Sequence, residues 1–341
     1  MMTMATGARS GRKLAAWLLV IALLAVAAFY VVTKRQELLD RLEVANYEPS
    51  ARVQQVVDVL DLTDAGELIF LASSPTVESS QRFNQQCKDV SHSDDGHVLG
   101  CYAEGRIHLF EVADERLSGV VEVTAAHELL HASFSRLTEG EIAELTPLLE
   151  RTYADLTSED PALKERMDLY AHLGRAAFAN ELHSVLGTEV ADLPPALEEH
   201  YATWFADREG LVTLFNQYHG VFVALQEQTT ALETEMKQLA DAIQKRSTAY
   251  TSELGAYDQD LSAFKARNAN FEFSDAPWEF EQIKNELALR RDWLEGERAA
   301  LNGEIDRYND LREQLAALSE TSAELDRNID SNLAPPSAEE E

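Results

Sequence analysis

A seven-residue repeat of apolar side chains runs through the last third of the chain and constrains its fold more than any other feature. This period places apolar residues along one seam of a helix that packs against another helix. The repeat is broken once, at 268–277, between two runs of about equal length. We therefore expect residues 211–330 to form an antiparallel coiled-coil hairpin, roughly 70 Å long. The seam positions are Tyr218, Leu225, Leu232, Leu239, Met236, Ile243, Tyr250, Tyr257 and Phe264, then Leu287, Leu294, Leu301, Tyr308, Leu315, Leu311, Leu318 and Leu325.

The same seam has a second interpretation, in which the helices associate between molecules, with another copy of the chain or with a different protein partner. An arm of this kind spaces two parts of a protein, binds a partner or covers an active site. After it, residues 331–341 contain two adjacent prolines and end in three glutamates. This composition predicts a disordered acidic tail.

An apolar segment without a charge, Leu14–Val32, lies near the other end of the chain. Its length is sufficient to span a bilayer as a helix. Three basic residues precede it, so the positive-inside rule places residues 1–13 in the cytoplasm and the main body outside it. We therefore expect a transmembrane signal anchor at 14–33. The alternative is a signal peptide with Ala25-Val26-Ala27 as its cleavage site, which also exports the main body.

The chain has a net charge of −31, and the acidic excess lies in the part expected outside the cytoplasm. Nucleic acids and anionic lipid headgroups both require a basic surface, so the charge argues against either as a partner. The two cysteines, Cys87 and Cys101, both follow the apolar segment. In an oxidising compartment we expect them to form a disulfide worth on the order of 3 kcal/mol, with two free thiols as the alternative.

Residues 34–210 have the pattern of a mostly α domain with a small antiparallel β element. Leu99–Ala103 and Arg106–Val112 predict a β-hairpin with Glu104-Gly105 as its turn. Its edge is a place where an extended peptide can pair, although an ordinary core hairpin explains the same pattern. We further expect a strand at 68–71 after a break at Gly66. The segment 73–96 is polar, and its serines, aspartates and glycine at 91–96 predict a loop inside the disulfide. Helices are expected at 36–44, after the cap Ser50, after Gly140, from Ser158 and Pro161 to Val185, and from Pro194-Pro195.

The stretch Thr124–His131, with the sequence T-A-A-H-E-L-L-H, carries the residues with the strongest chemical signal. His127 and His131 are one helical turn apart on the same face, so both imidazoles can bind one metal ion. Glu128 is placed to take a proton from a metal-bound water. The surrounding segment is apolar, and a buried carboxylate beside two buried imidazoles needs a partner or a cation. A structural helix with satisfied polar groups is the alternative.

A catalytic zinc ion usually takes three protein ligands, so a third group is required. The short extension H-x-x-G-x-x-H fails, because Phe134 and Leu137 occupy its glycine and histidine positions. Glu181 is the expected third ligand, since it is the charged member of an otherwise uncharged helical stripe from Leu163 to Val185. A salt bridge or a carboxylate at a helix end explains the same residue.

The pair of stretches H-E-L-L-H at 127–131 and N-E-L-H-S at 180–184 resembles the zincin metallopeptidases, in particular their gluzincin branch. The resemblance implies a helix-rich peptidase domain with a small sheet. It also implies Zn²⁺ held by the two histidines and Glu181, with Glu128 as the general base.

Val185 stands where that branch often has an aspartate that orients a ligand histidine, so Ser184 or Glu189 would have to serve instead. His200 and Tyr201 are candidates for donating a hydrogen bond to an oxyanion at the zinc. An aromatic-rich helix packing on the core is the alternative explanation for both residues.

Together these features predict a membrane-anchored, extracytoplasmic zinc peptidase that acts on a peptide or protein substrate and carries a coiled-coil arm. The competing hypothesis is an envelope scaffold or regulator, in which the hairpin engages a partner and the zincin-like domain is inactive or structural.

Overall fold

The computed structural model describes Trp17 and residues 34–88, 98–158 and 160–332 of the 341-residue chain. The expected cytoplasmic segment, nearly all of the expected anchor at 14–33 and most of the acidic tail lie outside the described residues. Over the residues that are described, no helix combines the length and the apolar character needed to cross a membrane. The chain divides into two compact units: Val221–Leu325, and the residues before and after it.

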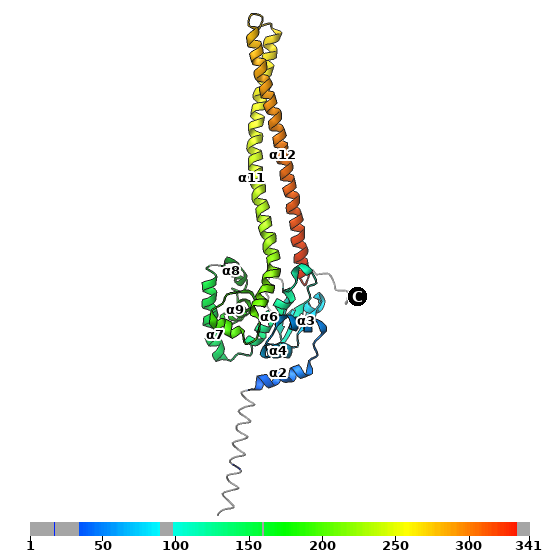
Figure 1. Ribbon diagram of the computed structural model, residues 1–341, viewed down its shortest axis with the longest axis vertical. Helices are drawn as coiled ribbons and strands as arrows, with labels where there is room; N and C mark the ends of the chain where they lie inside the picture. Colours follow the sequence, from blue (N-terminus) through cyan, green and yellow to red (C-terminus); the bar gives the residue numbers. More distant parts are fainter. Residues whose placement is uncertain (1–16, 18–33, 89–97, 159, 333–341) are drawn as a thin grey trace, which may run out of the picture. The chain divides into compact units, whose positions relative to one another are not determined.

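The first unit is mostly helical and contains a three-stranded sheet (Figure 1). This confirms the mostly α class with a small β element. Its strands are β1 (Thr76–Glu78), β2 (Gly100–Ala103) and β3 (Arg106–Phe110). Its helices are α2 (Arg35–Asn46), α3 (Ala51–Leu60), α4 (Asp64–Ala72), α5 (Ser80–Cys87), the 3-10 turn η1 (Glu115–Leu117), α6 (Val120–Phe134), α7 (Glu139–Leu156), α8 (Pro161–Asp168), α9 (Arg175–Glu189) and α10 (Pro195–Tyr201).

Several helices begin where the sequence predicts, because their first residues satisfy the free N–H groups of the first turn. The Ser50 side chain accepts a hydrogen bond from the N–H of Val53 at the start of α3. Helix α8 begins at Pro161 as expected, but its capping side chain is Asp160 and not Ser158. The continuous helix expected from 161 to 185 is wrong, since the chain turns between α8 and α9.

The strand expected at 68–71 is also wrong, because these residues belong to α4. Thr63 caps this helix by accepting a hydrogen bond from the N–H of Gly66, so Gly66 lies in a first helical turn and does not break one. A Cβ at Gly66 would lie 2.2 Å from the carbonyl oxygen of Trp204, which explains why a glycine is present. A run of four apolar residues is too short to separate a helical from a strand period.

The β-hairpin is confirmed, and its two turn residues, Glu104 and Gly105, both have positive φ angles, as a tight hairpin turn requires. The sheet is nevertheless mixed and not purely antiparallel. Strand β1 pairs in parallel with β3, giving the order β1-β3-β2. Both β1 and α5 lie in the polar segment 73–96. The residues expected to mark its loop, 91–96, lie outside the described residues.

The expected disulfide is present and joins Cys87, at the end of α5, to Cys101 in β2. Both cysteines are buried. Their Cα atoms are 5.9 Å apart. The bridge therefore ties α5 to the strand that runs beside α6.

Helix α6 is the centre of this unit and is buried over most of its length. One side of it packs on β2 and β3, and another packs on α9. The close approach of α9 depends on Gly187, where a Cβ would lie 2.4 Å from Leu130 and 2.6 Å from the ring of Tyr201. This packing brings the residues of the two predicted motifs together.

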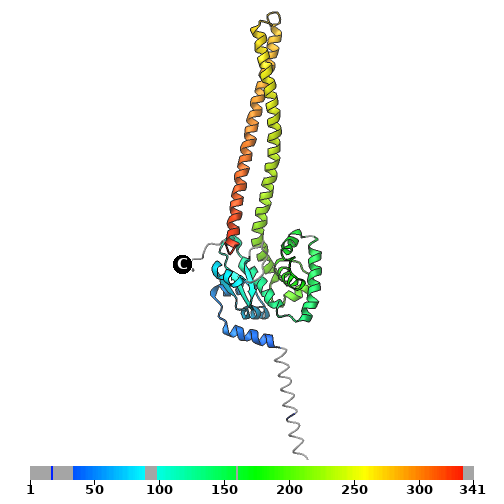
Figure 2. The ribbon, with the colours of Figure 1, turned by 180° about the vertical axis from the view of Figure 1, so that it is seen from behind.

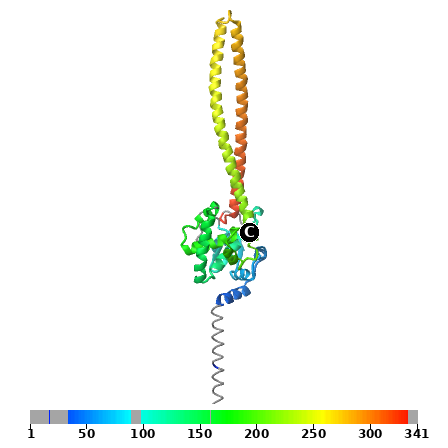
Figure 3. The same ribbon diagram turned by 60° about the vertical axis from the view of Figure 1, so that its left-hand side comes forward.

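The second unit, Val221–Leu325, consists of the adjoining parts of α11 (Arg208–Ala269) and α12 (Pro277–Ile329). The two helices run side by side in all three views (Figures 1, 2 and 3). Two ion pairs join the helices, Arg246 with Glu297 and Glu253 with Arg290. The later residue of α11 pairs with the earlier residue of α12, as it must when two helices are antiparallel. These pairs confirm an antiparallel helical hairpin, while coiled-coil packing of the seam stays a prediction. Of the expected seam, the fully buried members are Leu287, Leu294, Leu301, Leu311 and Leu325.

Candidate metal centre

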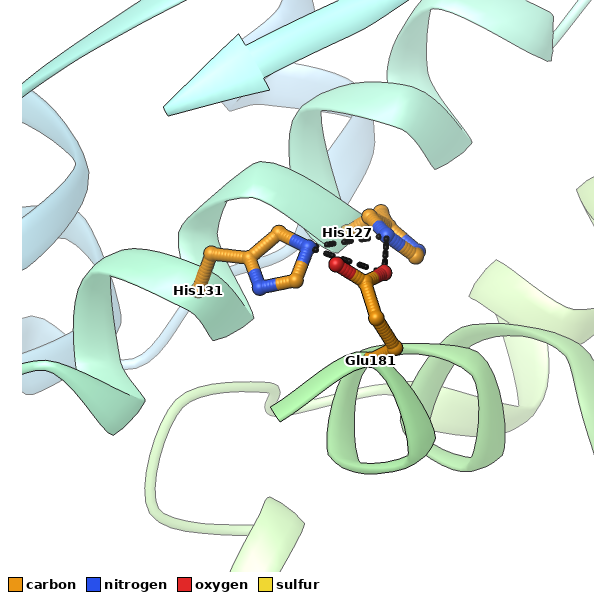
Figure 4. A group of neighbouring side chains, drawn as sticks. All are labelled: His127, His131 and Glu181. Atoms are coloured by element: carbon orange, nitrogen blue, oxygen red, sulfur yellow. Dashed lines mark hydrogen bonds and ion pairs between the residues drawn. The ribbon is translucent and has the colours of Figure 1, made fainter. Parts of the chain in front are cut away.

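Helices α6 and α9 bring together the three residues expected to bind a metal, and their side chains converge on one point (Figure 4). The Nε2 atoms of His127 and His131 are 3.1 Å apart. Oε2 of Glu181 lies 3.7 Å from Nε2 of His127 and 3.5 Å from Nε2 of His131. A tetrahedral zinc ion with bonds of about 2.0–2.1 Å needs ligand atoms roughly 3.3 Å apart. The three side chains are therefore spaced so that they could hold a metal ion.

The three side chains of the cluster are partly exposed to solvent. The His127, His131 and Glu181 side chains retain 19%, 12% and 21% of their exposure. Water and a substrate group therefore have access to the point where the three side chains converge, as a catalytic metal requires and a closed structural site does not.

The electrostatics of the cluster match the ionisation states that a metal needs. Burial by itself would raise the pKa of Glu181, but hydrogen bonds to His127 and His131 hold that pKa well below its usual value. Burial would likewise lower the pKa of His131, but its hydrogen bond to Glu181 and the charge of Glu181 raise the pKa to about 9. Glu181 is thus an anion at neutral pH, and a cation has to displace a proton from His131 in order to bind.

Asn180 lies beside His131 and helps to raise the pKa of that imidazole. Nδ1 of His131 and Oδ1 of Asn180 are both buried, and neither has a hydrogen-bond partner among the described residues. An N–H at Nδ1 that points to Asn180 leaves the lone pair of Nε2 for a metal. Of the two residues expected to do this, Glu189 instead pairs with Arg166 at 2.8 Å, and Ser184 is buried.

Glu128 lies beside the cluster and is only 5% exposed. Burial raises the pKa of its carboxyl group, while the charges of His131 and His127 and a hydrogen bond from the backbone N–H of Tyr102 act in the opposite direction. A carboxyl group whose pKa is shifted towards neutrality is suited to general base catalysis. Strand β2 can approach this close because Gly100 has no side chain: a Cβ there would lie 2.9 Å from Oε1 of Glu128.

Strand β2 is an edge strand, and its free edge faces Glu128. Ala103 and Arg106 flank the two-residue turn and pair directly, so hydrogen-bonded pairs alternate from there along the hairpin. This alternation directs the N–H and C=O groups of Gly100 and Tyr102 away from β3. Among the described residues, no strand pairs with that edge. The N–H of Tyr102 bonds Glu128, so the groups left on this edge for pairing with an extended chain are the N–H and C=O of Gly100 and the C=O of Tyr102.

Arg136, just after α6, connects the edge strand to the first described helix. Its guanidinium lies 3.0 and 3.1 Å from the carboxylate oxygens of Asp40 in α2, a buried residue. It also donates to the carbonyl of Ala132 at 2.8 Å and to the hydroxyl of Tyr102 at 3.3 Å. One side chain therefore joins α2, α6 and β2.

The two residues expected to stabilise an oxyanion occupy different surroundings. Tyr201 is fully buried, and its hydroxyl donates its hydrogen to the carbonyl of His183 in α9 at 2.8 Å. That hydrogen is therefore not free to bond an oxyanion. His200 is half-buried, and its Nε2 lies 2.9 Å from Nε2 of His183. Burial lowers the pKa of both histidines, so each is neutral at pH 7 and one donates to the other. The oxyanion role of His200 stays a prediction.

Tyr170, which was not among the predicted site residues, interacts electrostatically with Glu181 and Glu128. It lies in the turn between α8 and α9. Burial raises the pKa of its phenol, and the charges of Glu181, Glu189 and Glu128 raise it further. The phenol is thus a neutral donor within the electrostatic field of both site carboxylates. The sequence did not indicate this role, because Tyr170 fits the apolar stripe of the continuous helix that was wrongly expected from 161 to 185.

Comparison of the chain with protein-family models, curated proteins and solved structures finds no match. The zincin resemblance therefore depends on the residues of α6 and α9 themselves. Two imidazoles and one carboxylate are donors that Zn²⁺ binds, and other divalent transition metals also bind such sets.

Proposed function

We propose that the protein is a zinc-dependent peptidase of the zincin type, anchored in a membrane through residues 14–33 with its main body outside the cytoplasm. The observation that carries the proposal is the convergence of His127, His131 and Glu181, with the buried Glu128 beside them. The four-residue spacing of the two histidines by itself explains why their imidazoles lie together. It does not explain why a carboxylate about fifty residues further along the chain lies beside both of them.

In this proposal His127, His131 and Glu181 hold the ion. A bound Zn²⁺ supplies a Lewis acid that polarises the scissile carbonyl and lowers the pKa of water. Glu128 accepts a proton from the attacking water and delivers it to the leaving amine, and its raised pKa favours both transfers.

The substrate class that the geometry favours is an extended peptide. Such a chain would pair with the N–H and C=O groups of Gly100 and the C=O of Tyr102, as in other cases where a peptide adds a strand to a sheet edge, while the N–H of Tyr102 stays bonded to Glu128. This pairing would bring a peptide bond past Glu128. Tyr170, a neutral donor that interacts electrostatically with the site carboxylates, and His200 are the two candidates for bonding an oxyanion.

The test combines metal analysis and turnover of the full chain, purified without chelators. The Glu128→Gln variant should keep about one zinc per chain and lose roughly 10²–10⁴-fold in hydrolysis of a fluorogenic peptide library. The Glu181→Gln variant should lose the zinc. Glu122→Gln is the matched control, because Glu122 is a buried carboxylate of α6 that pairs with Arg52 instead of the cluster. A wild-type protein without stoichiometric metal would refute the proposal.

The competing function is an envelope scaffold or regulator that acts through the hairpin. Exposed tryptophans on α12 favour it, since a hairpin used only as a spacer has no need of them. In that case Glu128→Gln would support the biological role fully, whereas a chain without 221–325 would not.

A further inference from the structure

One side of α12 exposes large apolar side chains. Trp278, Leu289 and Trp293 are 69%, 72% and 48% exposed. At 100° per residue these three lie within an arc of about 60°, on the side of the helix opposite to the buried leucines of its first half, Leu287, Leu294 and Leu301. A hollow of about 310 Å³ opens beside Leu289 and Trp293. The hairpin therefore leaves this side of α12 without a partner among the described residues.

The same side contains glycines that the hairpin does not require. A Cβ added at Gly296 or at Gly303 would meet nothing within 4 Å. A glycine inside a helix costs about 1 kcal/mol relative to alanine. Small residues also allow another helix to approach closely. With Ala300 between them, these residues extend the apolar side; Trp278, Leu289, Trp293, Gly296, Ala300 and Gly303 are called the outer face below.

We propose that the outer face binds the outer face of a second copy of this chain, with the two α12 helices antiparallel. The large side chains lie before residue 296 and the small ones from 296 onward. A two-fold axis between residues 296 and 297 sets Trp293 of each copy on Ala300 of the other, and Leu289 beside Gly303. The contact is thus self-complementary, as a two-fold interface must be.

Charges at the border of the outer face fit the same register. The axis that pairs Trp293 with Ala300 also brings the exposed Arg307 of one copy beside the exposed Glu286 of the other, twice per dimer. Arg307 already pairs with Glu235 of its own hairpin, so the added carboxylate extends a charge network. Two copies aligned in parallel would instead bring Glu286 beside Glu286, which repels.

The area is sufficient for a specific but modest contact. Tryptophan side chains bury up to about 250 Å² each, so the exposed parts of two tryptophans and a leucine supply on the order of 400 Å² per copy. With the flanking residues, the total for two copies approaches the lower limit of about 1,200 Å² for a specific interface. Acidic residues outnumber basic ones along the hairpin, so added salt should strengthen the association by screening net repulsion.

The test uses a single introduced cysteine, because the two native cysteines are joined in a disulfide. In the full chain purified in detergent, Gly296→Cys places a thiol near the proposed axis and should form covalent dimers under mild oxidation. Gly255→Cys is the matched control, since Gly255 is also an exposed glycine inside a long helix, α11, with nothing within 4 Å of its Cβ. We expect at least a tenfold difference in cross-linking rate. Equal rates, or no cross-linking of either variant, would overturn the proposal.

Charge exchange tests the register independently. Glu286→Arg and Arg307→Glu should each lower the dimer fraction in sedimentation equilibrium by severalfold, and the double variant should restore it. Replacing Trp293 by alanine should abolish dimers, with an unchanged helical circular dichroism signal. A dimer that survives the loss of Trp293, or single charge variants that the exchange does not rescue, would contradict this interface.

Discussion

Replacement of Gly100 by alanine separates the stability of the first unit from its chemistry. A Cβ at this position would lie 2.6 Å from the side-chain methyl carbon of Thr124, and 2.9 Å from both Cγ and Oε1 of Glu128. Ordinary van der Waals contacts begin near 3.4 Å. The added methyl group therefore requires β2 to move by roughly 0.5–1 Å, or Glu128 to leave its position.

The expected magnitudes follow from these two contacts. Overpacking a core position in this way costs about 1–3 kcal/mol of unfolding free energy. A displacement near 1 Å at a general base lowers turnover by about 10²-fold. The second substitution Thr124→Ser removes the methyl group at 2.6 Å and leaves the contact with Glu128 in place. The double variant should therefore regain much of the stability and little of the activity.

The assay is urea unfolding followed by circular dichroism, together with peptide hydrolysis at saturating zinc, for the wild type, both single variants and the double variant. Gly140→Ala is the control, because the nearest atom to an added Cβ there is 4.0 Å away, at Thr138. Wild-type turnover in the Gly100→Ala variant would refute the argument that β2 positions Glu128. Recovery of activity together with stability in the double variant would refute it as well.

Four further predictions concern other parts of the structure. In the chelated protein, the free energy of unfolding should fall as pH rises from about 6.5 to about 9. The pKa of His131 is raised in the folded state, so its contribution to stability is fully present below pH 6.5 and is lost as pH passes through 9. Saturating zinc should remove this pH dependence in thermal melts. Asp40→Asn should destabilise the protein by about 3–5 kcal/mol in urea, since it leaves the Arg136 side chain, which is only 13% exposed, without its carboxylate; an effect below 1 kcal/mol would show that the pair is not structural. Replacing both cysteines, Cys87 and Cys101, by serine should cost about 3 kcal/mol in the same assay, and reducing agent should then have no further effect on the variant. Tyr170→Phe should lower kcat by about 10²-fold with little change in KM if its phenol bonds the oxyanion, and an unchanged kcat would return that role to His200.

The parts of this protein that the sequence predicts are those whose cause is local. The heptad spacing and the single break are sufficient for the antiparallel hairpin, because each seam residue repeats the same environment seven positions later. The spacing of His127 and His131 likewise places them on one face of α6. Glu181 could be found at a distance because a carboxylate in an apolar stripe needs a partner.

The parts that were missed depend on contacts between elements. Strand β1 is three residues long and half-buried, so it has no period to detect; its pairing with β3 defines it. The turn between α8 and α9, which brings Tyr170 towards the site, interrupts a stripe that looks continuous in the sequence. Gly100 and Gly187 carry no signal of their own, since each matters only for the neighbour that a Cβ would meet.

The bond between Asp40 and Arg136 affects how the protein should be prepared for study. A shortened chain that begins after Asn46 removes α2 and leaves the partly buried guanidinium of Arg136 without a counterion beside Tyr102. Its edge strand would be free to shift next to Glu128, and such a chain could bind metal poorly for reasons unrelated to its ligands. A soluble version for metal analysis should therefore begin before Arg35, so that the helix next to the expected anchor is kept as part of the folded unit.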